Sequence, residues 1–180
     1  MKFRELSLSG AWEINIERRE DARGFFARSY CDREFSDHGL NTTWVQMNVS
    51  FSLTKGTLRG LHFQRDAAAE VKLVRCSRGR VFDVIVDLRS GSPTYGQHCS
   101  VVLDSELRNS IYIPVGFAHG FQTLSDGCEL QYSHSSAYQM GHEGGINALD
   151  PMLDIAWPFP PTVMSDRDRD LVPLTECKPL

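Results

Sequence analysis

The sequence predicts an all-β protein whose short antiparallel strands form a sandwich or barrel. Strict alternation of apolar and polar residues is its strongest periodic signal, several short β-rich runs are separated by Gly and Pro, and helical patterns are scarce. Apolar residues make up 41% and charged residues 23%, as expected for a globular chain. With 180 residues and no repeat or linker, we expect one domain covering residues 1–180.

The clearest strand spans residues 44–51, where two sets of side chains alternate. Such a pattern is typical of a strand with one buried apolar face and one polar face. The apolar set is Val45, Met47, Val49 and Phe51, and the polar set is Gln46, Asn48 and Ser50.

The remaining strands are predicted from short β-rich runs between turn signals. Residues 71–76 and 81–88 are joined by a hairpin-length connection, and the later strands cover 98–103, 111–114, 121–124 and 129–133.

Helices are predicted at two places only. One short helix runs from its N-cap Asp32 to Gly39, and a turn of helix covers 104–109. From Asp150 onward, prolines and Trp157 indicate an extended tail packed across the sandwich, and the charged run 166–170 is interpreted as a solvated face.

Charge and cysteine usage exclude several classes of partner. Nineteen basic against twenty-three acidic residues argue against nucleic acid or an acidic membrane as a partner, although a small anion pocket remains compatible. The five cysteines contain no Cys-x-x-Cys pair, which indicates unpaired thiols in a reducing cytoplasm. No signal peptide and no apolar stretch of about 18 residues is present, so we expect a cytoplasmic protein without a membrane span.

Two segments concentrate functional residue types. In 59–64, a glycine between Arg59 and His62 permits a β-bulge that would turn both side chains toward a cavity; the alternative is a core histidine and a surface arginine. In 114–121, the spacing Pro-x-Gly-x-x-His, ending at His119, is similar to the second half of the cupin signature. The His-x-His first half is missing, so we expect a cupin-type double-stranded β-helix, or jelly-roll sandwich, without metal.

Without a metal, acid–base chemistry is the natural use of these residues. His62 or His119 could act as a general base at neutral pH. Lys72 lies on an otherwise apolar strand face and could stabilise an oxyanion. Tyr132 suits a general acid. The alternatives are a snorkelling lysine at a sheet edge and a tyrosine that only fills the core.

Taken together, the ordered segments resemble the dTDP-4-dehydrorhamnose 3,5-epimerase family. The resemblance covers roughly residues 4–168 and includes the segments 21–26, 46–50, 59–64, 72–75, 83–89, 92–96 and 114–121, followed by Tyr132, Tyr138, Glu143 and Trp157-Pro158. It implies a homodimeric jelly roll that moves protons at C3 and C5 of a nucleotide-linked 4-keto sugar, in deoxysugar biosynthesis, with no cofactor.

The resemblance also implies a role for each residue. His62 is the base with Asp168 as its partner, Lys72 stabilises the C4 oxyanion beside His119 and Arg59, and Tyr132 returns the proton from the opposite face. The nucleotide diphosphate is contacted by Arg23, Phe26, Gln46, Asn48, Tyr138 and Glu143.

Arg28, Met47 and Val49 depart from the family pattern where it would contact the base and diphosphate. Three alternatives therefore stay open beside the 3,5-epimerase: a monoepimerase or an enzyme for a CDP- or GDP-linked sugar, a non-catalytic cupin that binds sugar nucleotides, and a metal-dependent cupin oxygenase.

Overall fold

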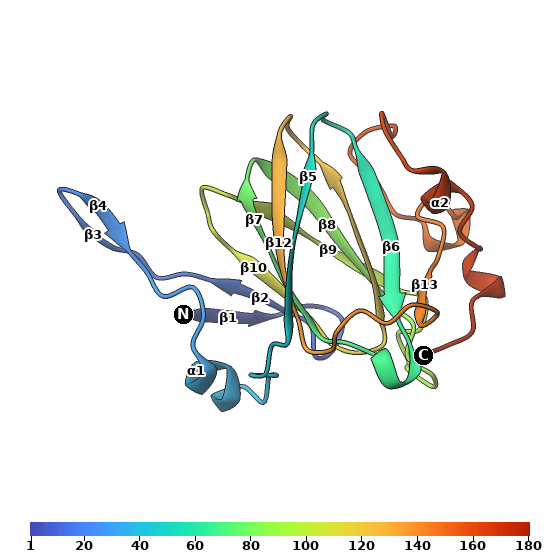
Figure 1. Cartoon of the computed structure of the whole chain (residues 1–180), viewed down its shortest axis with the longest axis horizontal. Helices are drawn as coiled ribbons and strands as arrows, with labels where there is room; N and C mark the ends of the chain where they lie inside the picture. Colours follow the sequence, from blue (N-terminus) through green and yellow to red (C-terminus); the bar gives the residue numbers. More distant parts are fainter.

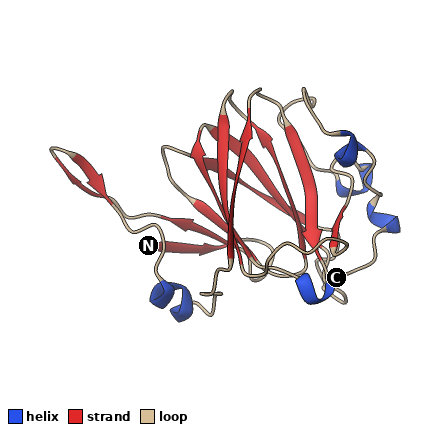
Figure 2. Cartoon of the chain, in the orientation of Figure 1, coloured by secondary structure: helices blue, strands red, loops and turns tan.

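Two antiparallel sheets face each other in the computed structural model, which describes residues 1–180 (Figures 1 and 2). The six-stranded sheet has the order β1-β2-β10-β7-β12-β5, and the five-stranded sheet has the order β13-β6-β11-β8-β9. This is the jelly-roll sandwich that the sequence predicts. None of the helices is long and apolar enough to cross a membrane.

The strands of the six-stranded sheet are β1 (Lys2–Glu5), β2 (Trp12–Asn15), β5 (Gln46–Ser52), β7 (Lys72–Arg78), β10 (Ser110–Ile113) and β12 (Cys128–His134). Those of the five-stranded sheet are β6 (Leu58–Gln64), β8 (Arg80–Asp87), β9 (His98–Asp104), β11 (Phe117–Thr123) and β13 (Glu143–Gly145). Outside them lie the hairpin β3 (Arg19–Asp21)–β4 (Gly24–Phe26), the helices α1 (Asp32–Asp37) and α2 (Asp166–Arg169), and the short 3-10 turns η1 (Asp66–Ala68), η2 (Pro151–Leu153) and η3 (Leu174–Glu176).

Strand β8 is buried on both faces, because it contributes to two apolar layers. Val81 and Ile85 pack between the two sheets, whereas Val84 and Val86 pack in a second cluster that includes Leu153 of the C-terminal tail. The tail thus covers the outer face of the five-stranded sheet, as the sequence predicts. Apolar burial on both faces of β8 stabilises this sheet between the core and the tail.

The predicted strands are all present, with small shifts of their ends. Strand β11 begins earlier than predicted, at Phe117. The predicted helix exists as α1, but its N-cap is Cys31 and not Asp32, and no side chain caps it. The predicted helical turn at 104–109 is reduced to a single turn in which the Arg108 amide donates to the Asp104 carbonyl oxygen at 2.7 Å; no helix forms, and the turn joins β9 to β10.

The burial expected for strand β5 is reversed. Its apolar set is exposed, with Met47 at 74% and Val49 at 62% of full exposure, whereas its polar set faces the interior of the sandwich. Strand β5 forms the edge of its sheet, and its apolar face has no covering layer within the chain. Alternation showed that the two faces differ, but it does not say which one faces the core of the same chain.

Asp87, at the end of β8, organises the turn that follows. Its buried carboxylate accepts hydrogen bonds from the Arg89 guanidinium at 2.7 and 2.9 Å and from the hydroxyls of Ser92 at 2.7 Å and Thr94 at 2.6 Å. Burial acts to raise the pKa of Asp87, but these hydrogen bonds outweigh it and hold the pKa well below its usual range.

We expect Asp87→Asn to lower the free energy of unfolding by about 2–3 kcal/mol at pH 7, because hydrogen bonds to a charged acceptor are lost. The depressed pKa of Asp87 in the folded state means that its carboxylate stabilises the fold above its unfolded pKa of about 4, and that this contribution fades as the pH falls further. Denaturant unfolding of variant and wild type should therefore give a gap at pH 7 that narrows at pH 3. The exposed Asp37→Asn serves as the control, and an equal gap at both pH values would contradict the assignment.

Candidate active site

A cavity of about 660 Å³ lies between the two sheets at the end where polar side chains replace the apolar core. Strands β5, β6, β7, β11 and β12 and helix α2 contribute its walls. Seven of the predicted site residues line it: Asn48, Arg59, His62, Lys72, His119, Tyr132 and Asp168.

His62 and Asp168 form a hydrogen-bonded pair in this cavity. His62 Nε2 lies 2.7 Å from Asp168 Oδ1, and the Asp168 carboxylate is almost fully buried. Burial acts to raise the pKa of Asp168, but the hydrogen bonds from His62 and from the Gly60 amide outweigh it and lower the pKa. An ionised carboxylate accepts the Nε2 proton, so the free lone pair of the imidazole is on Nδ1. Such a pair is suited to general-base catalysis.

Helix α2 delivers Asp168 to this position. The Ser165 hydroxyl caps the helix by accepting a hydrogen bond from the Asp168 amide at 3.1 Å. The charged run 166–170 is therefore not only a solvated face: Asp166 is exposed, but Asp168 points inward. The sequence of the charged run does not show which of its residues is buried, because the packing of the tail determines that.

The predicted bulge next to His62 is present. Strand β6 has one extra residue relative to β11 between the pairs His119↔His62 and Phe121↔Arg59. Gly60, at φ +112°, packs its Cα against Gly120, and its amide donates to Asp168 Oδ2 at 3.1 Å. The bulge thus brings the base and the hydrogen-bond donor to the same carboxylate.

Lys72 lies on the inner face of β7 together with Val74 and Cys76, and its side chain is buried. The alternative of a lysine at a sheet edge is wrong, because β7 lies between β10 and β12. Its ammonium is 3.3 Å from Glu70 Oε1 and 3.5 Å from the His62 carbonyl oxygen across the sandwich. A cation held inside the cavity can stabilise an oxyanion.

Tyr132 approaches from the sheet opposite to His62. Its hydroxyl is 2.9 Å from Ser50 Oγ, and burial raises the pKa of the Tyr132 phenol. The phenol therefore stays protonated at neutral pH and is suited to donate a proton. Tyr132 is packed against the core as well, so its packing role is observed, and its role as an acid stays a prediction.

His119 forms a second pair with a buried carboxylate. Its Nε2 is 2.9 Å from Asp83 Oδ2, and the other Asp83 oxygen has no hydrogen-bond partner. Complete burial raises the pKa of Asp83, although the neighbouring His119 and Lys72 act in the opposite direction. The His119 ring also contacts Tyr132 edge-on at 6.2 Å between ring centroids.

Five predicted contact residues lie outside the cavity. Gln46, Tyr138 and Glu143 form a connected group: the Tyr138 amide donates to Gln46 Oε1 at 3.0 Å, the Tyr138 hydroxyl donates to Glu143 at 3.1 Å, and Gln46 donates to Asn48 at 3.2 Å. Arg23 and Phe26 are not brought to the cavity of the same chain. They belong to the β3–β4 hairpin, which projects away from the sandwich (Figure 1), and Phe26 is 75% exposed.

Four polar cavity residues, Ser50, His134, Ser165 and Arg167, were not among the predicted site residues. Ser50 and His134 share the parity of Asn48 and Tyr132 on their strands, and that spacing is the signal that could have found them. Arg167 lies outside the strands, so no strand spacing in the sequence indicates that it faces the cavity. No group of three or more His, Cys, Asp or Glu side chains lies close enough to hold a metal ion.

The cavity thus combines a histidine–carboxylate base on one wall, a protonated phenol on the other and a lysine ammonium between them. This set can remove a proton from one side of a bound molecule, stabilise the resulting anion and return a proton to the other side.

Comparisons with known proteins agree with this chemistry. The family model described as dTDP-4-dehydrorhamnose 3,5-epimerase matches residues 5–176. The chain is 43% identical to the dTDP-4-dehydrorhamnose 3,5-epimerase of Methanothermobacter thermautotrophicus, over 97% of this chain and 95% of that protein. It is 41% identical to the dTDP-4-dehydrorhamnose 3-epimerase of Streptomyces niveus, over 99% of this chain and 86% of the relative.

Among solved structures, one similar protein is the dTDP-6-deoxy-D-glucose-3,5-epimerase of Legionella pneumophila in complex with dTDP-4-keto-L-rhamnose. The TM-score is 0.90 at 37% identity, with 97% of this chain and 93% of that chain covered.

We expect Gly60→Ala to destabilise the protein by about 3 kcal/mol, because the new Cβ would meet backbone at a strained φ. It would lie 2.6 Å from Gly120 Cα and 2.8 Å from the His119 carbonyl oxygen. Gly91→Ala is the matched control, since Gly91 also has a positive φ but nothing within 4 Å; only about 1 kcal/mol of conformational strain is expected there. Denaturant unfolding measures both, and equal losses would show that the Gly60–Gly120 contact carries no special cost.

Proposed function

This chain belongs to the dTDP-4-dehydrorhamnose 3,5-epimerase family, and we propose that it epimerises C3 and C5 of dTDP-4-dehydro-6-deoxy-D-glucose to give dTDP-4-dehydro-L-rhamnose. The single observation that carries the proposal is the placement of His62–Asp168 and Tyr132 on opposite sheets of one cavity. Inversion of a carbon centre requires a base on one face of the sugar ring and an acid on the other.

The reaction follows from the acidity of carbons next to a ketone. His62 Nδ1 takes the proton from the carbon, the C–H electron pair forms the enolate, and Lys72 stabilises the negative charge on the C4 oxygen. Asp168 balances the imidazolium. The phenol of Tyr132 then gives its proton to the other face of the carbon. The resulting phenolate takes a proton from solvent and the His62 imidazolium releases its proton to solvent, so both groups return to their starting states. The same groups act on C3 and C5 in turn, because both carbons flank the C4 ketone.

The thymidine-linked substrate is supported by the relatives, whose names specify dTDP sugars. In this chain, the exposed Tyr138 ring and the Gln46–Tyr138–Glu143 group offer an aromatic face and polar groups beside the cavity. The unpaired thiols of all five cysteines fit a cytoplasmic enzyme.

Incubation with dTDP-4-keto-6-deoxyglucose in deuterium oxide should introduce deuterium at both C3 and C5, measured by NMR of the product. We expect Tyr132→Phe to lose inversion at least about 100-fold while retaining exchange, because His62 still removes and returns a proton on its own face. His62→Ala should lose both.

The outcomes separate the alternatives. Deuterium at C3 alone would identify a monoepimerase, like the Streptomyces niveus relative, which is named a 3-epimerase. Tighter binding of CDP or GDP than of dTDP in a competition assay would indicate a CDP- or GDP-linked substrate. Nucleotide binding without any exchange in the folded protein would indicate a non-catalytic cupin and contradict the proposal.

We further propose that the enzyme is a homodimer in which the exposed face of β5 is covered by the partner. Val45, Met47, Val49, Phe51 and Leu53 form one exposed apolar row at the edge of the six-stranded sheet. An apolar strand edge of this length is prone to pair or pack with another chain. In the proposed dimer, the partner chain covers this apolar row.

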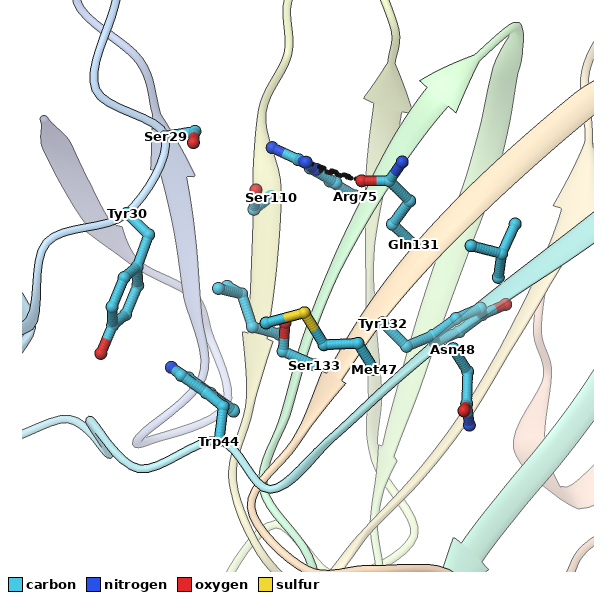
Figure 3. A pocket seen from close by; sticks show the side chains of 12 residues that line it. Ser29, Tyr30, Trp44, Met47, Asn48, Arg75, Ser110, Gln131, Tyr132 and Ser133 are labelled. Carbon is cyan, nitrogen blue, oxygen red and sulfur yellow. Dashed lines mark hydrogen bonds between the residues drawn. The ribbon is translucent and has the colours of Figure 1, made fainter.

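A second pocket, of about 490 Å³, adjoins this row on the outer face of the sheet (Figure 3). Tyr30, Trp44 and Met47 line it beside the hydrogen-bonded pair of Arg75 and Gln131, and the Trp44 indole N–H is buried without a partner. A pocket with an unpartnered donor next to an exposed apolar row is the composition expected of an interface. The projecting β3–β4 hairpin would then carry Arg23 and Phe26 toward the partner's cavity.

We expect Met47→Asp to convert the dimer to a monomer, because a carboxylate would be buried without a partner at the centre of the interface. The molar mass from light scattering should fall to about half. Met152→Asp, on the exposed part of the tail, is the control and should leave the mass unchanged. A wild-type protein that is monomeric at all concentrations would contradict the dimer.

A further inference from the structure

A third histidine–carboxylate pair lies at the cavity, on the wall opposite to His62–Asp168. It consists of His134, on β12, and Glu70, in the loop before β7. In the register of the six-stranded sheet, His134 is directly opposite Lys72. Lys72, Tyr132 and His134 point into the cavity from their strands, and Glu70 contacts both Lys72 and His134, so the pair belongs to the same wall as the proposed acid and oxyanion groups.

The three side chains form a continuous buried network. Glu70 Oε2 is 2.7 Å from His134 Nδ1, and Glu70 Oε1 is 3.3 Å from the Lys72 ammonium. All three side chains are about nine-tenths buried. Burial acts to raise the pKa of Glu70, but its two partners outweigh burial and lower the pKa, so the group is an anion at neutral pH.

The tautomer of His134 follows from its neighbours. The Asn48 amide nitrogen, 3.3 Å from Nε2, can only donate a hydrogen bond, so Nε2 is the acceptor and Nδ1 carries the proton given to Glu70. The imidazole is stacked on Tyr132, with ring centroids 6.0 Å apart and planes 20° apart. His134 is thus held on both nitrogens and leaves the second oxygen of Glu70 free for Lys72.

The effect on Lys72 is geometric. An ammonium has three N–H donors and rotates freely unless acceptors direct it. Glu70 and the His62 carbonyl oxygen direct two of them, from opposite sides of the sandwich. The third donor is left for a group bound in the cavity. Without Glu70, the ammonium would have one protein acceptor and no fixed direction.

We propose that Glu70, itself fixed by His134, is a positioning residue that aims the Lys72 ammonium at the developing oxyanion. This inference rests on the proposed function, in which Lys72 stabilises the C4 enolate. Neither Glu70 nor His134 touches the reacting atoms in this role. Their contribution is preorganisation: the cation is already oriented when negative charge forms, so no reorganisation is needed in the transition state.

Glu70→Gln is the decisive variant, because it keeps the shape and removes the charge. Lys72 and His134 contact different oxygens of Glu70, and glutamine replaces one of these oxygens with an NH2 group that cannot accept a hydrogen bond, so one of the two contacts is lost. We expect kcat to fall about tenfold or more, as for the loss of one oriented charged contact in the transition state, with KM changed less than twofold. Glu176→Gln, an exposed change of the same chemistry, should have no effect on either constant. His134→Gln should lower kcat in the same direction and covers the case in which Glu70→Gln does not fold.

Two further measurements do not depend on turnover. The ¹⁵N chemical shifts of histidine-labelled protein should report the Nδ1–H tautomer of His134 in the wild type and its loss in Glu70→Gln. A crystal structure of Glu70→Gln should show the Lys72 ammonium displaced from the His62 carbonyl oxygen. If Lys72 and the His134 tautomer are unchanged in the variant, or if kcat is unchanged, the positioning role is overturned. An inactive wild type with both structural changes present would instead contradict the proposed reaction and not the positioning of Lys72.

Discussion

The constraint on which the cavity depends is that each carboxylate buried between the two sheets must receive hydrogen bonds from neighbouring side chains. Ionised groups removed from water are costly unless each has a partner of opposite charge and enough hydrogen bonds. Three carboxylates are satisfied to different degrees: Asp168 is paired with His62, Glu70 with both His134 and Lys72, and Asp83 with His119 through one oxygen only. The three come from the tail, from β8 and from a loop, so the polar end of the sandwich forms only when the whole chain is folded. The apolar core at the other end supplies the stability that this arrangement requires.

Strand periodicity carried much of what the sequence could predict. The inward parity of Lys72 with Val74 and Cys76 was visible, and the bulge at Gly60 followed from a glycine between two functional residues. What could not be predicted were relations that depend on register and packing between distant segments. In the sequence, Asp83 and Glu70 look like ordinary charged residues. Their histidine partners become apparent only when β8 is paired with β11, which carries His119, and β7 with β12, which carries His134. The resemblance to a family supplied Asp168, which the pattern of charges alone assigned to solvent.

Strand β5 shows the limit of hydrophobic patterning most clearly. Its apolar row was expected to face the core and is exposed, while the polar residues between the row face the cavity. A period of two identifies two different faces, but an apolar face can be covered by another chain as well as by its own. The polar face is also not solvated in the ordinary sense, because it forms part of a binding cavity. Both observations have one cause: alternation separates two faces of a strand, but it does not specify what lies opposite each face.

The same two-sheet geometry explains why a jelly roll is suited to inversion at carbon. A base and an acid must reach opposite faces of a flat enolate, and the two sheets of a sandwich supply opposed walls whose separation is set by the core. The walls differ in their electrostatics. His62 is partly open to the cavity and hydrogen-bonded to the Asp168 carboxylate, whereas burial raises the pKa of the Tyr132 phenol and keeps it protonated. Lys72 bridges the walls, since it starts from the sheet of Tyr132 and ends beside the backbone of His62. The direction of proton transfer is therefore built into the asymmetry of the two sheets, before any sugar is bound.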